Sequence, residues 1–422
     1  MTELVHAPVR REKPNFLQVW PILLGLLGYE LISFLPGWLG VESRLITVPY
    51  RSFFLLLCVF VTLRLLPQRR PKISFFMALI MVFWAAYLTR LFYDSFFTAY
   101  RFARPVEEYW LYAFCLGFIP IFAYMVPLRR ITIYTSMLYA FYLAAVVNII
   151  ALYTNLTTAT MSASAARMVG NEFLNPISYG QLGTMLVLLG VCLLINGVSA
   201  GKKLYALFIY LMMLTGLINV ALSGSRGPFM QLIITLLLLA AFKLKRKYWG
   251  YAALAFVGCV ITCIVLSAAF PVFDVLIERI NTTGNTGNVN DNLRLQVLTN
   301  AWNGFLDEPL LGTSFEERKL GMYPHNYLVE ACMTTGFLGG IIMLAIYIHA
   351  FVGSVKLLKD DTKCWVGLLC IMCLLSGLTT GSLWGGFKFW ALITLVDNLL
   401  YKPRKRVVVN PVLVRHHLIV EQ

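Results

Sequence analysis

Apolar runs of about 20 residues recur along almost the whole chain, and each is long enough to cross a bilayer as a single helix. Only 13% of the 422 residues are charged and 59% are hydrophobic, whereas about 25% of a soluble domain is charged. The sequence therefore predicts one integral membrane domain over residues 1–422, an all-α polytopic fold with about 12 transmembrane helices. These helices are expected at 17–36, 45–66, 73–93, 109–126, 131–153, 177–197, 204–222, 228–243, 248–270, 326–352, 364–381 and 385–401.

Basic residues cluster in every second connection between these runs, for example at Arg69-Arg70 and between Lys243 and Lys247. Because the cytoplasmic loops of membrane proteins are enriched in Lys and Arg, this alternation predicts that both termini are cytoplasmic. It also accounts for the net charge of +15 without nucleic acid as a partner. Six segments are then expected on the outer side, namely 37–44, 94–108, 154–176, 223–227, 271–325 and 382–384.

The outer segment 271–325 is the longest break between apolar runs. A loop of this length is more often functional than a simple connector. Its second half also has a helical pattern, because apolar residues recur at helical spacing within Asn292–Trp302; these are Leu293, Val297, Leu298, Ala301 and Trp302. We therefore expect a large, partly helical outer loop over the reaction site, with an amphipathic helix on the outer surface; the resemblance described below implies that this loop is periplasmic.

The turn Ser223–Pro228 joins two short predicted helices and carries Arg226 at the start of the second. The free N–H groups and the dipole at a helix N-terminus favour an anion. An arginine at membrane depth is costly unless it has a partner. Arg226 could instead extend to the membrane interface, but anion binding is the interpretation that we favour.

Arg294 lies near the start of the predicted amphipathic helix. A cation is unfavourable in the first turn of a helix, so we expect an anionic group to hold it. The alternative is an exposed arginine on a polar helix face. Arg167, in the outer segment 154–176, is a weaker candidate of the same kind.

The stretch from Tyr323 to Glu330 marks the start of the tenth predicted span. Pro324 keeps the preceding residue out of a helix and allows one to begin after it. His325 is then expected at the outer mouth of the span, where it could accept a proton from a hydroxyl group. Glu330 lies inside the apolar run, where a carboxylate is usually functional or paired. An interfacial polar histidine is the alternative for His325.

These arginines and His325 are predicted to face outward without a matching acidic cluster. An Asp-rich outer loop would have indicated a metal-bound diphosphate. Its absence favours arginine side chains as the groups that neutralise an anionic substrate. We therefore expect neither a metal site nor a cofactor.

Several of these motifs, in this order, resemble the O-antigen ligase/polymerase superfamily over roughly residues 165–345. They are the Ser-Gly-Ser-Arg-Gly turn, the Arg294 helix followed by Glu308–Gly312, and Pro324–Glu330 with Gly336 and Gly339-Gly340. The resemblance implies a GT-C-type glycosyltransferase of the bacterial inner membrane that is active on the periplasmic side and independent of metal. The donor would be an oligosaccharide linked to undecaprenyl diphosphate.

The resemblance also implies residue roles. Arg226 and Arg294 would hold the diphosphate, and His325 would be the catalytic base. Substrate binding is further expected of Arg167, Tyr323, Asn326 and Glu330. Diphosphate is a good leaving group that needs its growing negative charge stabilised, which fixed guanidinium groups can do.

Tyr323-Pro324 precedes the His-Asn pair where many ligases have a second histidine. This departure favours a repeat-unit polymerase, in which the acceptor is another glycan and a chain-length regulator could be a partner. The alternative is a ligase that transfers the glycan to lipid A-core. A flippase or transporter for lipid-linked glycans, the alternative from another class, would be expected to carry midplane charges or broken helices in matching halves.

Overall fold

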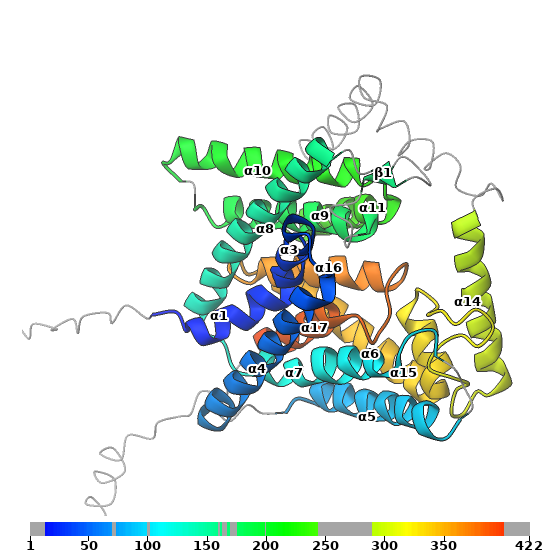
Figure 1. Cartoon of the computed structure of the whole chain (residues 1–422). Coiled ribbons are helices and arrows are strands. Elements are labelled where there is room, and N and C mark those ends of the chain that lie inside the picture. Colours follow the sequence, from blue (N-terminus) through cyan, green and yellow to red (C-terminus); the bar gives the residue numbers. More distant parts are fainter. Residues whose placement is uncertain are drawn as a thin grey trace, which may run out of the picture.

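The computed structural model describes residues 13–69, 73–98, 102–158, 161–162, 167–168, 175–198, 200–243 and 289–400. This part of the chain is a bundle of helices with one short antiparallel strand pair (Figure 1). The elements up to the strands are α1 (Phe16–Leu23), η1 (Leu24–Gly28), α2 (Tyr29–Ile32), α3 (Leu35–Leu39), α4 (Ser43–Arg69), α5 (Phe75–Phe96), α6 (Val106–Trp110), η2 (Leu111–Phe118), α7 (Ile119–Tyr124), α8 (Arg130–Thr158), β1 (Met161–Ser162) and β2 (Arg167–Met168). They are followed by α9 (Pro176–Ile195), α10 (Lys203–Leu222), α11 (Arg226–Lys243), α14 (Val289–Asp307), α15 (Tyr327–Leu357), α16 (Cys364–Gly377) and α17 (Phe387–Leu400).

Nine helical segments of the described residues are long and apolar enough to cross a membrane, which confirms the predicted all-α polytopic fold. They are Phe16–Leu39, Ser43–Gln68, Phe75–Phe96, Val106–Tyr124, Arg130–Asn155, Pro176–Ile195, Lys203–Leu222, Arg226–Lys243 and Tyr327–Leu357. Two more predicted spans, 364–381 and 385–401, coincide with α16 and α17, which have only 14 residues each. The predicted span 248–270 lies outside the described residues, so the count of about 12 stays a prediction.

Two of the spans contain a π-helical stretch in place of regular α-helix. η1 connects α1 to α2, and η2 connects α6 to α7. The hydrogen bonds of a π-helix are offset by one residue, which can leave a carbonyl available to a side chain. Here the Tyr50 hydroxyl donates a hydrogen bond of 2.8 Å to the carbonyl of Leu24, the first residue of η1. This hydrogen bond connects the start of η1 to α4.

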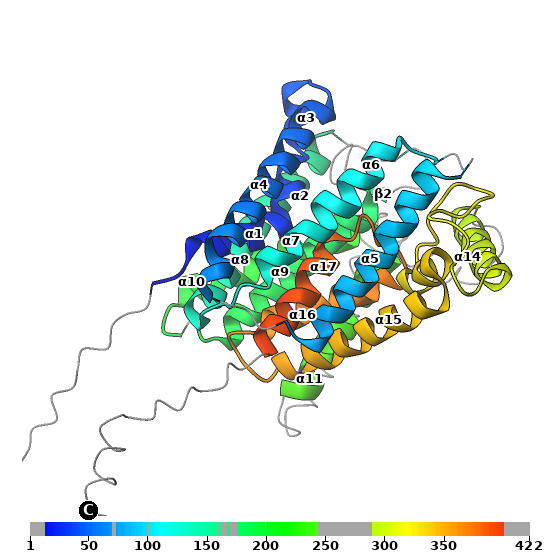
Figure 2. The same cartoon turned by 90° about the horizontal axis from the view of Figure 1, so that it is seen from below.

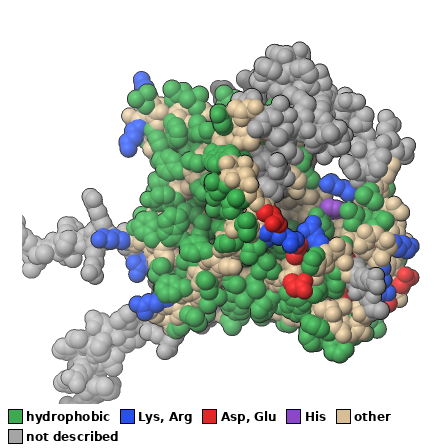
Figure 3. All heavy atoms as spheres, in the orientation of Figure 1, with side chains coloured by type: hydrophobic (Ala, Val, Ile, Leu, Met, Phe, Trp, Pro, Cys, Tyr) green, Lys and Arg blue, Asp and Glu red, His purple; other side chains and the backbone are tan. Residues whose placement is uncertain are grey.

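The surface of the bundle matches a lipid environment. Figure 3 shows a broad hydrophobic zone between basic side chains at the left edge and a mixture of acidic and basic side chains on the right. Helix α4 contributes an exposed apolar stripe at helical spacing, consisting of Phe53, Leu56, Phe60 and Leu63. In water such a stripe would be unfavourable, whereas in a bilayer it faces lipid.

Helix α14 lies at the edge of the bundle, on the opposite side from the start of α1, in both views (Figures 1 and 2). It packs against α15. Its buried residues are Val297, Ala301 and Phe305, which are four residues apart and so share one face. The predicted amphipathic helix is therefore present, and Trp302, one of its apolar residues at helical spacing, is 44% exposed.

Helix α15 contains a break at Gly336, where the loop after α14 packs into it. Gly336 has a positive φ of 69°. The backbone N–H of Phe337, the next residue, donates a hydrogen bond of 2.7 Å to the carbonyl of Pro309. The backbone N–H of Thr313 donates one of 2.7 Å to the carbonyl of Met333. The loop thus supplies hydrogen-bond partners to backbone groups at the break in the helix. This contact fixes α14 and its loop relative to the start of α15.

We expect Gly336→Ala to destabilise the protein. A Cβ atom at this position would lie 2.2 Å from the Leu310 carbonyl oxygen, and the positive φ is itself unfavourable for alanine. Strain of this kind costs about 1–3 kcal/mol. The purified variant should have a lower apparent melting temperature than the parent protein. Gly37→Ala is the matched control, because nothing lies within 4 Å of its added Cβ; equal melting temperatures for the two variants would contradict the prediction.

Candidate active site

His325 occupies a strained backbone position immediately before α15. Its φ of 58° makes it the one non-glycine residue with positive φ among those that the structure describes. Such conformations are costly and cluster at functional sites. The imidazole Nδ1 is buried and has no hydrogen-bond partner within the described part of the chain. The ring packs against Tyr323, with 4.4 Å between the centroids.

Asn326 positions His325 just before the N-terminus of α15. It is the N-cap of α15, and its side-chain oxygen accepts hydrogen bonds from the backbone of Leu328 at 3.0 Å and Val329 at 3.2 Å. Its amide nitrogen donates to the carbonyl of Leu378 at 3.1 Å. The cap fixes where the helix begins, and with it the place of His325.

Electrostatics connect His325 with Arg294 of α14. Burial lowers the pKa of His325 from its usual 6.5 to about 4, and the positive charge of Arg294 contributes to the same shift. The imidazole is therefore neutral at physiological pH and able to accept a proton. Burial raises the pKa of Tyr323, and the nearby Glu330 adds to the rise while Arg294 opposes it. Tyr323 consequently remains protonated.

Arg294 differs in its ion pairing from three other arginines of the predicted outer segments. Arg44 and Arg104 both pair with Glu108, at 3.0 and 3.6 Å, and Arg318 pairs with Glu308 at 3.7 Å. Within the described residues Arg294 makes no ion pair and no hydrogen bond. Its charge is compensated by no neighbouring carboxylate there, which leaves the guanidinium to an external anion.

Glu330 is fully buried in the first turn of α15. Its carboxylate accepts a hydrogen bond of 2.7 Å from the Tyr87 hydroxyl and bonds of 3.0 Å from the backbone N–H of Leu383 to both oxygens. Buried carboxylates need such partners. Glu330 therefore connects the first turn of α15, which follows His325, to α5 and to the turn before α17.

A second buried pair, which the sequence analysis did not single out, anchors the loop between α14 and α15. Arg90 of α5 pairs with Asp94 at 3.0 Å and donates to the carbonyls of Gly312, at 2.9 Å, and Thr313. Asp94 in turn accepts a hydrogen bond of 2.7 Å from the backbone of Phe315. Arg90 within the predicted span 73–93 was the available signal, since charges at membrane depth are rare without a role.

Glu316 adds a third buried carboxylate to this region. It accepts a hydrogen bond from the Tyr109 hydroxyl and one of 3.1 Å from the backbone of Ala103. The Tyr109 ring also packs against Trp384, which packs against Tyr323 at 6.1 Å between centroids. The loop before His325 is thus held against α5 and α6 by acidic side chains that face inward.

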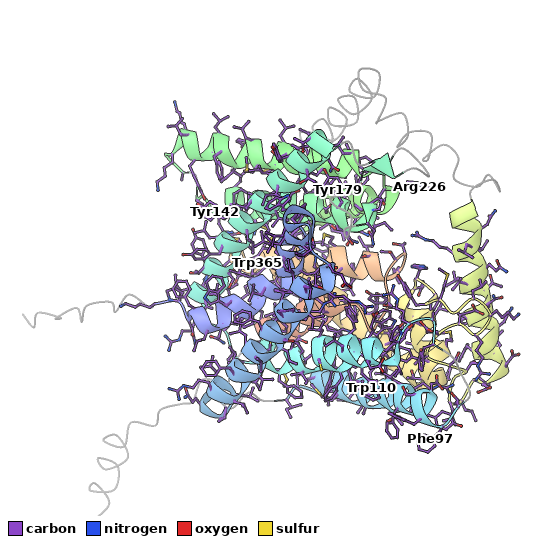
Figure 4. All side chains as sticks on the ribbon, in the orientation of Figure 1. Phe97, Trp110, Tyr142, Tyr179, Arg226 and Trp365 are labelled. Carbon is purple, nitrogen blue, oxygen red and sulfur yellow. The ribbon has the colours of Figure 1, made fainter. Side chains whose placement is uncertain are left out.

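Arg226 is the first residue of α11, as the predicted turn requires. Gly224 in the turn has a φ of 53°, and the Ser223 hydroxyl donates to the Val220 carbonyl at 2.6 Å and accepts from the backbone of Ser225 at 3.3 Å. Arg226 lies on the right-hand side of the bundle, where α14 also lies (Figure 4). In Figure 3 a histidine side chain is next to basic side chains on that side.

Arg167 is described at backbone level only, in β2, where Ser162 of β1 is its pairing partner. The first part of the predicted loop, 271–288, lies outside the described residues. In the described residues, no three His, Cys, Asp or Glu side chains are grouped so that they could hold a metal ion. Metal independence and the role of Arg167 stay predictions.

Residues 211–344 match the family model described as O-Antigen ligase. The match includes the α10–α11 turn with Arg226, helix α14 with Arg294, and the start of α15 with His325. The resemblance to the O-antigen ligase/polymerase superfamily is thereby confirmed over this stretch. No curated protein matched the chain.

Proposed function

We propose that this protein is a glycosyltransferase that moves a glycan from undecaprenyl diphosphate onto an acceptor sugar at the periplasmic face of the bacterial inner membrane. The acceptor hydroxyl oxygen would form a bond to the anomeric carbon, whose bond to the diphosphate oxygen breaks. The electron pair leaves with the diphosphate, and the hydroxyl proton passes to His325. Arg294 and Arg226 would stabilise the charge on the leaving group.

The observation that carries this proposal is the pairing of a neutral, strained histidine with an arginine that no described carboxylate neutralises. The charge of Arg294 acts on His325, which supports placing the base and the anion-binding group in one site. The bound substrate would also raise the pKa of His325. A diphosphate bound to Arg294 would offset the charge that lowers the pKa of His325, and would so make the imidazole a stronger base when the donor is present.

The remaining candidate residues would position this centre or contact the substrate. We assign Glu330 a positioning role, because it has no exposed surface and its carboxylate is occupied by Tyr87 and Leu383. Asn326 would position His325 through the helix cap. Tyr323 would contact the substrate beside the imidazole, and Arg167 is proposed as a further contact to the donor.

The activity can be tested with purified protein and a synthetic lipid-linked oligosaccharide. Transfer should release undecaprenyl diphosphate and extend the glycan, which thin-layer chromatography and mass spectrometry would detect. Movement of the lipid-linked glycan across liposomes without release of diphosphate would contradict the proposal and support a flippase.

A polymerase is the form of this activity that we propose, and the Tyr323-Pro324 pair before the histidine is the feature that favours it. The description of the matching family model favours a ligase as the second candidate. Deleting the gene and resolving lipopolysaccharide on a gel separates them. A polymerase deletion leaves lipid A-core with a single repeat, whereas a ligase deletion leaves bare core and accumulates lipid-linked polymer.

We expect Arg226→Lys to reduce transfer although it preserves the charge. An arginine can form two parallel hydrogen bonds to one phosphate, and lysine cannot. Loss of one charged hydrogen bond corresponds to a decrease of roughly tenfold or more. Initial rates of diphosphate release would measure it, with Arg44→Lys as the control, because the Arg44 side chain is 70% exposed and pairs with Glu108. Equal rates for both variants would remove Arg226 from the site.

A further inference from the structure

Arg51 lies within the membrane-spanning helix α4, far along the chain from Arg226, Arg294 and His325. Its guanidinium lies over the ring of Tyr112, at 4.6 Å from the centroid, and near the ring of Tyr29, at 5.5 Å. It makes no ion pair and no hydrogen bond with the residues that the structure describes. A cation at membrane depth without a carboxylate is unusual, and such residues commonly mark ligand sites.

A cavity of about 150 Å³ adjoins this arginine. Apolar side chains of α4 and η2 form much of its wall, including Phe54 and Leu116, and Arg51 supplies its positive charge. The tyrosines Tyr29 and Tyr112 line the same space, and within the described residues neither hydroxyl donates a hydrogen bond. One cation and two tyrosines without a donated hydrogen bond therefore line an otherwise mainly apolar space.

The charged groups near the cavity are already satisfied by each other. Glu30, next to Tyr29, pairs with Lys388. The third tyrosine of the wall, Tyr50, uses its hydroxyl for the Leu24 carbonyl. Neither contact neutralises Arg51, so the cavity keeps a net positive character that is complementary to an anion.

Helix α4, which contributes Tyr50, Arg51 and Phe54 to the cavity wall, also has an exposed apolar face. Phe53 and Leu56, which flank Phe54 on α4, are 58% and 67% exposed. Arg51 is eight residues from the start of α4 at Ser43, which places it roughly 12 Å along the helix from that end. Long basic side chains at such depth can extend so that their charged end is near the interface, which is where the phosphates of lipids lie.

We propose that this cavity binds a phosphate-bearing lipid. The phosphate would contact the Arg51 guanidinium and the hydroxyls of Tyr29 and Tyr112, and the hydrocarbon chain would lie along Phe54 and the exposed stripe of α4. A lipid fits better than a soluble phosphate, because the walls are mainly apolar and α4 faces the bilayer. This site is distinct from the His325 centre and does not depend on the proposed glycosyl transfer.

The test is native mass spectrometry of the full chain after removal of copurified lipid. The probes are phosphatidylglycerol, undecaprenyl phosphate and, as the phosphate-free comparison, undecaprenol. We expect one tightly bound phosphate lipid per chain and a decrease in affinity of roughly tenfold or more in Arg51→Gln. Arg64→Gln is the matched control, because Arg64 is an exposed arginine of the same helix that does not line the cavity.

Each outcome bears on the proposal. Unchanged affinity in Arg51→Gln, or undecaprenol bound as tightly as undecaprenyl phosphate, would overturn it. Preference for undecaprenyl phosphate would support the site and identify a prenyl lipid as its source, and equal or stronger binding of phosphatidylglycerol would support it with a phospholipid. Leu24→Trp, which places a bulky side chain in the cavity, should abolish binding even with Arg51 present, so the proposal stays testable if Arg51→Gln fails to fold. Binding should be unaltered in His325→Asn.

Discussion

Replacing His325 with asparagine is expected to reduce glycan transfer by about 10²–10⁴-fold, the usual contribution of a general base. Asparagine is the sharper substitution, because it tolerates the positive φ of 58° that this position requires. It would keep the backbone while removing the group that accepts the proton. His325→Ala should lose activity to a similar extent and stability to a greater one. Release of undecaprenyl diphosphate from the purified variants would measure the rate, and thermal unfolding the stability.

His349→Asn provides the control for this prediction. His349 lies within α15, the helix that follows His325, stacks on Phe76 at 4.0 Å and is 3.3 Å from Asp397. Its loss should leave transfer close to the parent rate. If His325→Asn also retained full activity, the base assignment would be withdrawn, and the acceptor hydroxyl would need another proton acceptor.

The sequence was most informative where membrane physics limits the options. Length and apolarity were enough to identify nine described spans, because a helix must satisfy its own backbone in lipid. The α10–α11 turn and the start of α15 were also predictable, since Gly224 permits the positive φ of the turn and Pro324 restricts the backbone before α15. The helical pattern at 292–302 predicted α14, whose bounds extend further, from Val289 to Asp307.

Contacts between residues distant in the chain could not be predicted from these sequence patterns. Nothing in the sequence near His325 indicates that it adopts a positive φ, because that conformation is imposed by the cap at Asn326 and by contacts with distant elements. The exposure of Trp302 could not be predicted, for a related reason. Helical spacing identifies a set of apolar residues on one side, but the position of α15 decides which of them become buried.

The three inward-facing carboxylates illustrate the same limit. Asp94, Glu316 and Glu330 come from separate parts of the chain, yet all hold the segment between α14 and α15 or the turn behind it. Each bonds to backbone N–H groups, so each fixes the path of the chain and not only a side chain. Only Glu330 was recognised as unusual from the sequence, and its partners Tyr87 and Leu383 could not be predicted.

Arg294→Gln is expected to have two effects that a purely structural residue would not combine. Loss of a guanidinium that stabilises the departing diphosphate should reduce the rate by roughly 10²–10³-fold. Removal of its positive charge should also raise the pKa of His325 above about 4, although burial, the larger cause, still holds it below 6.5. Because the base acts when neutral, residual activity should begin to fall at a higher pH than in the parent protein as the solution is acidified.

The pH dependence of single-turnover transfer, measured from pH 4 upward, would separate these effects. The parent protein should remain active to a more acidic pH than Arg294→Gln, because a group with a lowered pKa stays neutral further into acid. Arg44→Gln should change neither rate nor profile, since Arg44 pairs with Glu108 at 3.0 Å on the protein surface. A low rate with an unshifted acid limb would mean that Arg294 acts on α14 packing and not on His325, whereas a normal rate would exclude it from the diphosphate site.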